Sequence, residues 1–299
     1  MVRGILAGLA AGALWGLVFV MPRMLSGFSA IDMASGRFVV YGAFSALVMA
    51  VVRGRPRPTL RQAGAALGLS VLGFTGYYTV LVFAIRDAGT EVPALLIGTI
   101  PLWVMFLGKP GHLRWAALAP GLLLTAAGLG LMMAAPHGAG GGADAAAGPA
   151  FWRGVALAVV SLASWTAFAL LNVAWLRRHP EVQATDWANW LGVATGLGAL
   201  GLWAVAGSPV AEIAARPGLG LYLALCASTG FGSAWLATVL WNLASRRLSS
   251  SLCGQLIVSE TLFALLYAFL LEGRWPSPAQ GVACILFTLG ILASVRAQR

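Results

Sequence analysis

Two charged side chains stand inside apolar stretches of this 299-residue chain, Glu260 in "VSETLFALLY" and Arg37 in "ASGRFVVYGA". A buried carboxylate can neutralise the ammonium of a bound solute or carry a proton, and a guanidinium can bind a carboxylate. Arg37 can also brace an outer gate with Asp32 or Glu91. The alternative for both charges is an internal salt bridge or a clamp by backbone carbonyls. We favour that alternative for Arg37, whose depth lets the side chain snorkel, and leave both roles open for Glu260.

Tryptophan recurs at the centre of two apolar segments, "ALWGLVFVMP" at 13–22 and "ASWTAFALLN" at 163–172. Helical spacing places each on a face that also carries small or polar residues and further aromatic residues. An indole N–H at mid-membrane needs a partner that lipid cannot supply, so these faces are expected to line a central cavity. The alternative is close helix packing. With the aromatic residues near 77 and 235, the candidate substrate-binding residues are Trp15, Phe19, Tyr77, Tyr78, Ser161, Trp165, Phe168, Asn172, Trp235 and Trp241.

The elements that position these residues are expected to be membrane-spanning helices. Of all residues, 60% are hydrophobic and 9% are charged, whereas soluble domains carry roughly 25% charged residues. No soluble fold of this size can hide so much apolar surface, so lipid must cover it. A helix of about 20 residues crosses a bilayer. Ten segments approach that length, at 3–22, 29–53, 61–85, 88–107, 113–133, 151–176, 184–207, 217–244, 249–271 and 277–297.

Positive residues between these segments predict the orientation. With the amino terminus inside, thirteen lie on the cytoplasmic side and five outside, which are Arg23, Arg86, Arg153, Arg216 and Arg274. This bias and an even number of spans predict a multi-pass protein of the cell (inner) membrane with both termini in the cytoplasm. An interfacial aromatic belt is expected at the segment ends, from Trp115, Trp152, Trp187 and Trp275.

The chain is expected to contain two copies of a five-helix unit. Counterparts follow in order along the two halves, namely Trp15 with Trp165 at an offset of 150, Asp32 with Asp186 at 154, and Gly121 with Gly281 at 160. Five is an odd number of spans, so the second copy enters from the opposite face and the repeats are inverted, as in secondary transporters. We expect repeats at 1–136 and 151–299, joined by a Gly/Ala-rich outer linker at 137–150.

The end of each half carries the most specific motif. In the second half, "VSETLFALLYAFLLEGRWPSPAQG" contains Glu260, then Glu272, and Gly281 nine residues later. In the first half, "GTIPLWVMFLGKPGHLRWAALAPG" keeps Pro101 but has neither acid. With the repeat, this pattern resembles the drug/metabolite transporter superfamily and, within it, the EamA family of ten-helix exporters. The opening helix with Trp15 is similar to the amino-acid exporters of YddG type.

The resemblance implies a secondary transporter that exports amino acids, with aromatic and other bulky neutral ones favoured. It also implies organic cations such as methyl viologen as substrates, and alternating access around a midplane cavity. The alternative is a proton-coupled drug/metabolite antiporter that uses Glu260. Kinks that gate the cavity are expected at Pro22, Pro93, Pro101, Gly98 and Gly254.

An intramembrane enzyme or a channel is disfavoured. The three histidines, His112, His137 and His179, fall in loops, and no catalytic, metal-binding or filter motif occurs in the sequence. We therefore expect no enzymatic activity, no metal, no cofactor and no nucleic-acid partner. The expected partners are a small-molecule substrate and the lipid bilayer, and the protein is expected to be a monomer.

Overall fold

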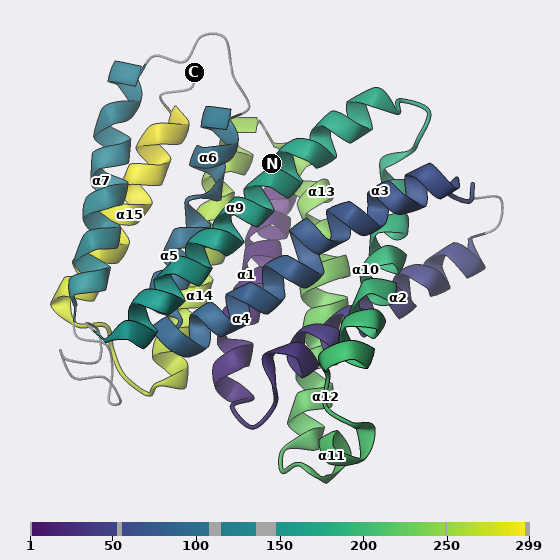
Figure 1. Cartoon of the computed structure of the whole chain (residues 1–299). Helices are drawn as coiled ribbons and strands as arrows, with labels where there is room; N and C mark the ends of the chain where they lie inside the picture. Colours follow the sequence, from purple (N-terminus) through teal and green to yellow (C-terminus); the bar gives the residue numbers. More distant parts are fainter. Residues whose placement is uncertain (1, 53–55, 108–114, 136–147, 249, 297–299) are drawn as a thin grey trace.

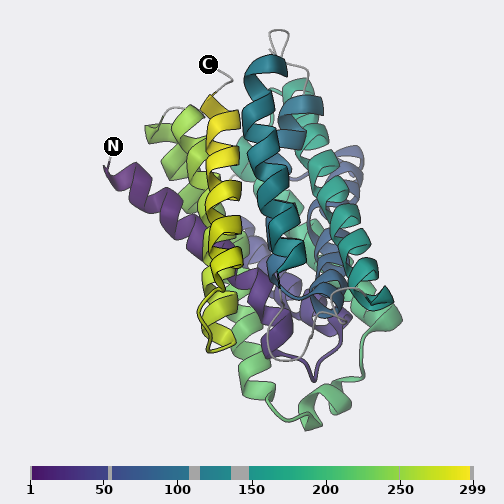
Figure 2. The same ribbon diagram turned by 90° about the vertical axis from the view of Figure 1, so that its left-hand side faces the viewer.

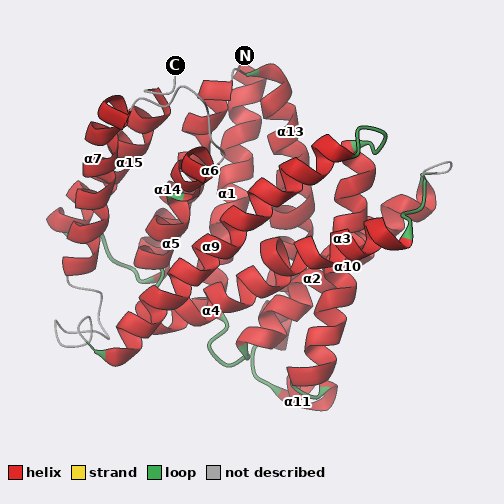
Figure 3. Ribbon diagram, turned by 45° about the horizontal axis from the view of Figure 1, so that its top comes forward, coloured by secondary structure: helices red, strands yellow, loops and turns green. Residues whose placement is uncertain are grey.

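Helices and the loops between them make up the part of the chain that its computed structural model describes, residues 2–52, 56–107, 115–135, 148–248 and 250–296 (Figure 1). The first half contains α1 (Val2–Met24), α2 (Ala30–Val51), α3 (Leu60–Ser70), η1 (Val71–Thr75), α4 (Gly76–Ala88), α5 (Glu91–Gly98), α6 (Ile100–Leu107) and α7 (Trp115–Ala134). The second half contains α9 (Pro149–Arg178), α10 (Ala184–Ala206), α11 (Val210–Ala215), α12 (Leu219–Ala227), η2 (Ser228–Leu236), α13 (Ala237–Arg247), α14 (Ser250–Leu271) and α15 (Pro278–Arg296). Within these ranges the only regular secondary structure is helical, as Figure 3 shows.

Seven of the described helical stretches are long and apolar enough to cross a membrane. Three shorter apolar helices lie at Glu91–Val104, Val258–Leu271 and Pro278–Ser294. The predicted all-helical, multi-pass membrane architecture is therefore confirmed. The start of α1 and the end of α15 lie at the same end of the bundle in Figure 1 and Figure 2. Of the predicted linker at 137–150, residues 137–147 lie outside the described residues.

Glycines let α1 and α14 pack closely. Gly8, Gly12 and Gly16 are buried at every fourth position of α1. A Cβ atom at Gly12 would lie 2.1 Å from Ser259 Oγ, and one at Gly16 would lie 2.9 Å from the backbone nitrogen of Ala264. Small residues at this spacing allow helix backbones to approach each other in a membrane, where the hydrophobic effect does not drive helix association. The part of α1 that carries these glycines is therefore a surface that packs against α14.

Other close helix pairs join the two halves of the chain. α2 packs against α10, α4 against α9, and α7 against α15. α7 and α15 lie side by side in both Figure 1 and Figure 2. At the crossing of α2 and α10, a Cβ atom at Gly42 would lie 2.5 Å from the Cα atom of Gly196. The two halves therefore share one interior instead of forming two separate bundles.

Two π-helical segments interrupt the long helical stretches at 60–88 and 219–247. They are η1, between α3 and α4, and η2, between α12 and α13. Ser164 of α9 donates a hydrogen bond to the Leu72 carbonyl in η1 over 2.7 Å, and Ser233 in η2 donates to the Leu14 carbonyl of α1 over 2.5 Å. π-helical turns are rare in proteins, and those that occur are often found at functional sites. Each of these two is tied to a helix of the other half.

The helical stretch at 91–107 is broken where Gly98 and Pro101 stand. The chain leaves the helical pattern at Thr99, so α5 ends at Gly98 and α6 begins at Ile100. The Thr99 hydroxyl donates to the Leu96 carbonyl over 2.6 Å. The contacts of Pro101 lie outside the described side chains, and so do those of Gly254 in α14.

The other two prolines that were expected to kink helices have different positions. Pro93 is the third residue of α5, in the first turn, where a missing N–H removes no helical hydrogen bond. The expected interruption at Pro93 is therefore wrong, because the helix begins later than the sequence suggested. Pro22 lies inside α1, and the helix continues for two residues beyond it to Met24.

Candidate functional site

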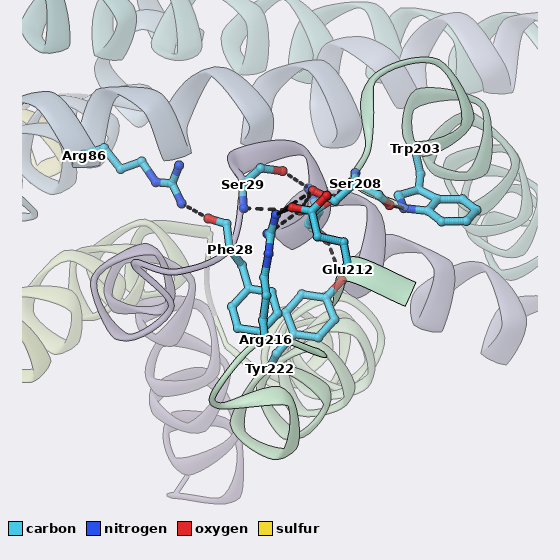
Figure 4. Close-up of polar contacts among 9 residues, drawn as sticks. Phe28, Ser29, Arg86, Trp203, Ser208, Glu212, Arg216 and Tyr222 are labelled. Carbon is cyan, nitrogen blue, oxygen red and sulfur yellow. Dashed lines mark hydrogen bonds and ion pairs between the residues drawn. The ribbon is translucent and has the colours of Figure 1, made fainter. Parts of the chain in front are cut away.

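Asp32 is the centre of a polar cluster at the start of α2, and Figure 4 labels its partners Ser29, Ser208 and Arg216. Its carboxylate accepts hydrogen bonds from the backbone N–H and the hydroxyl of Ser208, over 2.8 and 2.7 Å, and from Arg216 over 3.2 Å. It also completes a capping box with Ser29. Asp32 is fully buried, and a buried charge needs such partners. The cluster therefore fastens the loop at 207–218 to the start of α2.

The loop between α1 and α2 is held by three further contacts in the same region (Figure 4). Arg86 of α4 donates a hydrogen bond to the Phe28 carbonyl. The Tyr222 hydroxyl of α12 donates to the Asp32 carbonyl over 2.8 Å, and the rings of Phe28 and Tyr222 stack with centroids 4.5 Å apart. Helices from both halves therefore fix this loop.

A second polar cluster joins the loop after α14 to the first half. Arg274 donates to Glu91 at the start of α5 over 2.7 Å and also contacts Glu272. Arg23 at the end of α1 donates to Glu272 over 3.3 Å. With Arg153 bound to Asp87, each arginine that was predicted to lie outside contacts a carboxylate or a carbonyl, namely Arg23, Arg86, Arg153, Arg216 and Arg274.

Arg37 does not form the ion pairs that were considered for it. Asp32 pairs with Arg216 and Glu91 pairs with Arg274, so the hypothesis that Arg37 braces a gate with either acid is wrong. The physical reason is that two loops of the second half bring their own arginines to these acids. The sequence does not reveal where those loops fold back.

The guanidinium of Arg37 lies among aromatic rings instead. Its central carbon is 4.2 Å from the ring centroid of Tyr78 and 4.8 Å from that of Phe38. Arg37 is 5% exposed, and its Nε atom has no hydrogen-bond partner in the described part of the chain. Cation–π contacts stabilise the charge but do not give the Nε–H donor of the guanidinium an acceptor.

Glu260 lies in α14 where this helix packs against α1. A Cβ atom at Gly12 would lie 3.1 Å from the Glu260 backbone nitrogen. Among the described residues, no hydrogen bond or ion pair involves the half-buried Glu260 carboxylate. Glu260 and Arg37 are thus an anion and a cation that form no ion pair with each other or with another residue in the described part of the chain.

A central apolar cluster surrounds these charges with side chains from both halves. Val18 of α1, Phe38 of α2, Leu162 of α9 and Ala264 of α14 are buried within it. The partly buried aromatic residues that pack against this cluster include Phe74, Tyr77, Trp165 and Trp235. The arrangement offers aromatic faces, one carboxylate and one guanidinium inside a membrane protein.

Comparison with known proteins decides the family. Residues 2–135 match the EamA-like transporter family. The chain is 30% identical over 318 aligned positions to the inner membrane protein YtfF of Escherichia coli K12, covering 100% of this chain and 96% of the relative. The chain belongs to the EamA-like transporter family. A solved crystal structure has the same fold, with a TM-score of 0.65, 20% identity and 99% of each chain covered.

EamA-like membership points to a membrane transporter rather than an enzyme. It agrees with the resemblance inferred from the two repeat-end motifs, and the membrane location agrees with that of the relative. The family match covers the first half of the chain, and the relative extends the similarity over the second half.

In this EamA-like protein, the predicted substrate-binding residues fall into two groups that differ in solvent exposure. The buried group consists of Phe19, Tyr78, Ser161 and Phe168. The partly exposed group consists of Trp15, Tyr77, Trp165, Asn172, Trp235 and Trp241. Partly exposed side chains can contact a solute in this conformation, whereas buried ones such as Tyr78 and Arg37 can do so only after a rearrangement of the helices.

Asn172 has a partner within the protein. Its Oδ1 atom accepts a hydrogen bond from Trp187 Nε1 over 2.7 Å, and the Trp187 ring stacks on Trp175 with centroids 3.6 Å apart. Trp187 is 2% exposed, so its predicted place in an interfacial belt is wrong. The position of Trp187 near the end of a segment does not reveal that its side chain lies between α9 and α10. Trp152 and Trp275 are 54% and 90% exposed, as belt residues should be.

A row of aromatic rings that was not predicted from the sequence connects Trp165 to Arg37. Phe168 lies 6.0 Å from Trp165 and 5.4 Å from Phe74, between ring centroids. Phe74 in turn lies 6.1 Å from Phe38, which contacts the Arg37 guanidinium. The signal was available, because Phe74 stands in the "GFTG" sequence whose counterpart is "GFGS" in η2.

Proposed function

We propose that this protein exports amino acids, with aromatic and other bulky neutral ones favoured, by alternating access around a cavity between its two halves. The observation that carries the proposal is Glu260, a carboxylate inside the membrane without an ion-pair or hydrogen-bond partner among the described residues. A charge at this depth is costly, and the ammonium of an amino acid would compensate it. Tyr77 and Trp165, which pack against the central apolar cluster, suit a bulky side chain.

Contacts between the halves support two inverted repeats at 1–136 and 151–299. Gly42 meets Gly196, and 196 − 42 = 154 is the offset that also relates Asp32 to Asp186. A residue that touches its own counterpart is typical of a twofold axis through the contact. The seven long and three shorter apolar helices together match the number of predicted spans.

A second pair of contacts has the same relationship. A Cβ atom at Gly4 would lie 3.0 Å from the Leu248 side chain, and one at Gly154 would lie 2.7 Å from Ala88. Gly4 and Gly154 differ by 150 positions, and Ala88 and Leu248 by 160, which are the predicted offsets. In a transporter with inverted repeats, the two related halves can exchange conformations, and this exchange is the basis of alternating access.

The proposed topology places the protein in the inner membrane with both termini in the cytoplasm. Support comes from the shared end of the bundle at which α1 begins and α15 ends (Figure 2). In a variant without its native cysteines, Trp275→Cys should react with an impermeant thiol reagent added outside intact cells. Reaction only after lysis would contradict this orientation.

Transport of a zwitterion needs no coupling to the membrane potential. One net charge is worth roughly 2.3 kcal/mol per 100 mV, and an amino acid has no net charge. Export down a concentration gradient can therefore proceed alone. The second candidate is a proton-coupled antiporter for drugs or metabolites, including organic cations such as methyl viologen. The Glu260 carboxylate also supports the antiporter, because a carboxylate without an ion-pair partner can carry a proton.

Uptake of labelled phenylalanine into proteoliposomes tests the proposal. We expect uptake above that of protein-free vesicles, with and without an imposed pH gradient. No amino-acid flux would refute the amino-acid substrate. Flux that requires the gradient, or transport of methyl viologen alone, would favour the antiporter.

Matched tryptophan variants test the proposed cavity. Trp15→Ala and Trp165→Ala should lower uptake roughly tenfold, the loss expected from about 1.4 kcal/mol of binding. Trp152→Ala, at an exposed position near the start of α9, is the control and should keep normal uptake. Equal rates in all three variants would show that Trp15 and Trp165 serve packing alone.

A further inference from the structure

We infer that Arg37 is the residue that binds the substrate's carboxylate, which makes the site selective for α-amino acids over amines and organic cations. The inference rests on the proposed function and deepens it, because it names the chemical group that the second charge recognises. Its starting point is that the structure leaves Arg37 without the acids that were considered as its structural partners.

The surroundings of Arg37 contain neutral groups where a structural arginine would have an acid. Its guanidinium lies over the rings of Tyr78 and Phe38, at 4.2 and 4.8 Å. In the ranges that the structure describes, no carboxylate forms a salt bridge with Arg37.

The Nε atom of Arg37 is buried and has no hydrogen-bond acceptor in the described part of the chain. The whole residue is 5% exposed, so water cannot fully replace that acceptor. A guanidinium presents paired N–H donors that match the two oxygens of a carboxylate. An incoming carboxylate would therefore satisfy the Nε–H donor, for which the described residues supply no acceptor.

The structural role first favoured for Arg37 was an internal salt bridge or a clamp by backbone carbonyls, at a depth that permits snorkelling. A snorkelling side chain places its charged end in water, whereas this guanidinium lies over rings of α2 and α4 and the residue is 5% exposed. The acids nearer the membrane surface, Asp32 and Glu91, already bind other arginines.

Arg37 and Glu260 both border the central apolar cluster, Arg37 through the ring of Tyr78 and Glu260 one helical turn before Ala264. Tyr77 packs against the same cluster. An α-amino acid carries its ammonium and carboxylate on one carbon atom, so a single bound molecule would face both charges. The aromatic residues around Tyr77 would then receive the side chain. An organic dication would find the carboxylate of Glu260 but would be repelled by Arg37.

Competition for labelled phenylalanine uptake into proteoliposomes tests the inference. The competitors are unlabelled phenylalanine and phenethylamine, which has the same ring and ammonium but no carboxylate. In the wild-type protein phenylalanine should compete at least roughly tenfold better, the usual effect of one charge-assisted hydrogen bond. In Arg37→Gln this preference should disappear, with phenethylamine unchanged or stronger.

Two variants provide the controls. Arg37→Lys keeps the charge but not the paired donors, and should recover part of the preference. Arg153→Gln removes an arginine that is exposed and bound to Asp87, and should compete as the wild type does. Each protein must elute as a single species in detergent before reconstitution.

The outcomes separate the inference from the proposed function. Wild-type protein that carries no amino acid would overturn both. Phenylalanine transport with an unchanged preference in Arg37→Gln would overturn only the role of Arg37. An equal loss of affinity for phenylalanine and phenethylamine in Arg37→Gln would also overturn it, because a general structural defect does not distinguish the two.

Discussion

Arg274 donates a hydrogen bond to Glu91 over 2.7 Å, and the Glu91 side chain is 2% exposed. The pair connects the loop after α14 with the start of α5, two segments that lie 183 positions apart. Because a buried carboxylate without its partner is costly, this contact holds the two halves together at that end of the bundle. Together with the Asp32 cluster it closes the end opposite the described chain termini.

A double-mutant cycle should measure this connection. Glu91→Gln and Arg274→Gln should each lower the free energy of unfolding by about 1 to 3 kcal/mol, because each leaves a buried polar group without its charged partner. The double variant should lose less than the sum. Unfolding in mixed detergent micelles gives the values. Asp87 and Arg153 form the control pair, whose coupling should be much smaller because Arg153 is 68% exposed at its side chain.

The Gly42–Gly196 contact gives a second prediction. Gly42→Ala and Gly196→Ala should both destabilise the protein by about 1 to 3 kcal/mol, because the new Cβ atom meets backbone that cannot move aside. A thermal unfolding series in detergent measures the loss. Gly130→Ala in α7 is the control, since nothing lies within 4 Å of its Cβ position. Sensitivity at only one of the two crossing glycines would contradict the reciprocal contact.

Asn172 should affect stability more than substrate binding. Asn172→Ala leaves the Trp187 indole N–H without its acceptor in a buried place, at a cost of about 1 to 3 kcal/mol. Adding Trp187→Phe removes that donor and should restore part of the stability. Thermal unfolding and phenylalanine affinity are measured on the same preparations. A lower affinity at unchanged stability would instead make Asn172 a substrate ligand.

The sequence predicted the elements of this fold well and their contacts poorly. The lengths of apolar runs determine where helices cross a membrane, so the long helices fall close to the predicted ranges. The partners of charged residues depend on loops that return from far along the chain. Ser208 reaches Asp32 across 176 positions, and no local pattern indicates such a contact. For the same reason Arg37 was assigned partners that bind other arginines.

The candidate site was predicted in part. Periodicity alone placed Trp165 and Phe168 on one face of α9, and Tyr77 was chosen for its aromatic surroundings. Periodicity does not say which of these side chains is covered, and Phe168 proved to be buried while Trp165 is partly exposed. The π-helical turn η1 was not predicted, because its sequence resembles that of an ordinary helix. It rotates the residues that follow it relative to those before it.

The serines of α9 give the last prediction. Ser164 donates to the Leu72 carbonyl in η1 over 2.7 Å, and the fully buried Ser161 donates to the Tyr77 carbonyl over 3.3 Å. A π-helical turn shifts the backbone hydrogen bonds, and a carbonyl left out of the helical pattern needs another donor inside a membrane. The Ser164 hydroxyl gives the Leu72 carbonyl in η1 such a donor, so we expect it to stabilise η1, while Ser161 binds the Tyr77 carbonyl in α4.

Ser164→Ala should therefore lower the thermal midpoint and slow transport, because the position of Tyr77 depends on η1. Ser161→Ala should lower the midpoint less, since its hydrogen bond is longer, and should leave phenylalanine affinity within about twofold, a difference below roughly 0.5 kcal/mol. Ser228→Ala, at an exposed position of η2, is the control. A large loss of affinity in Ser161→Ala with unchanged stability would show that this hydroxyl contacts the substrate directly.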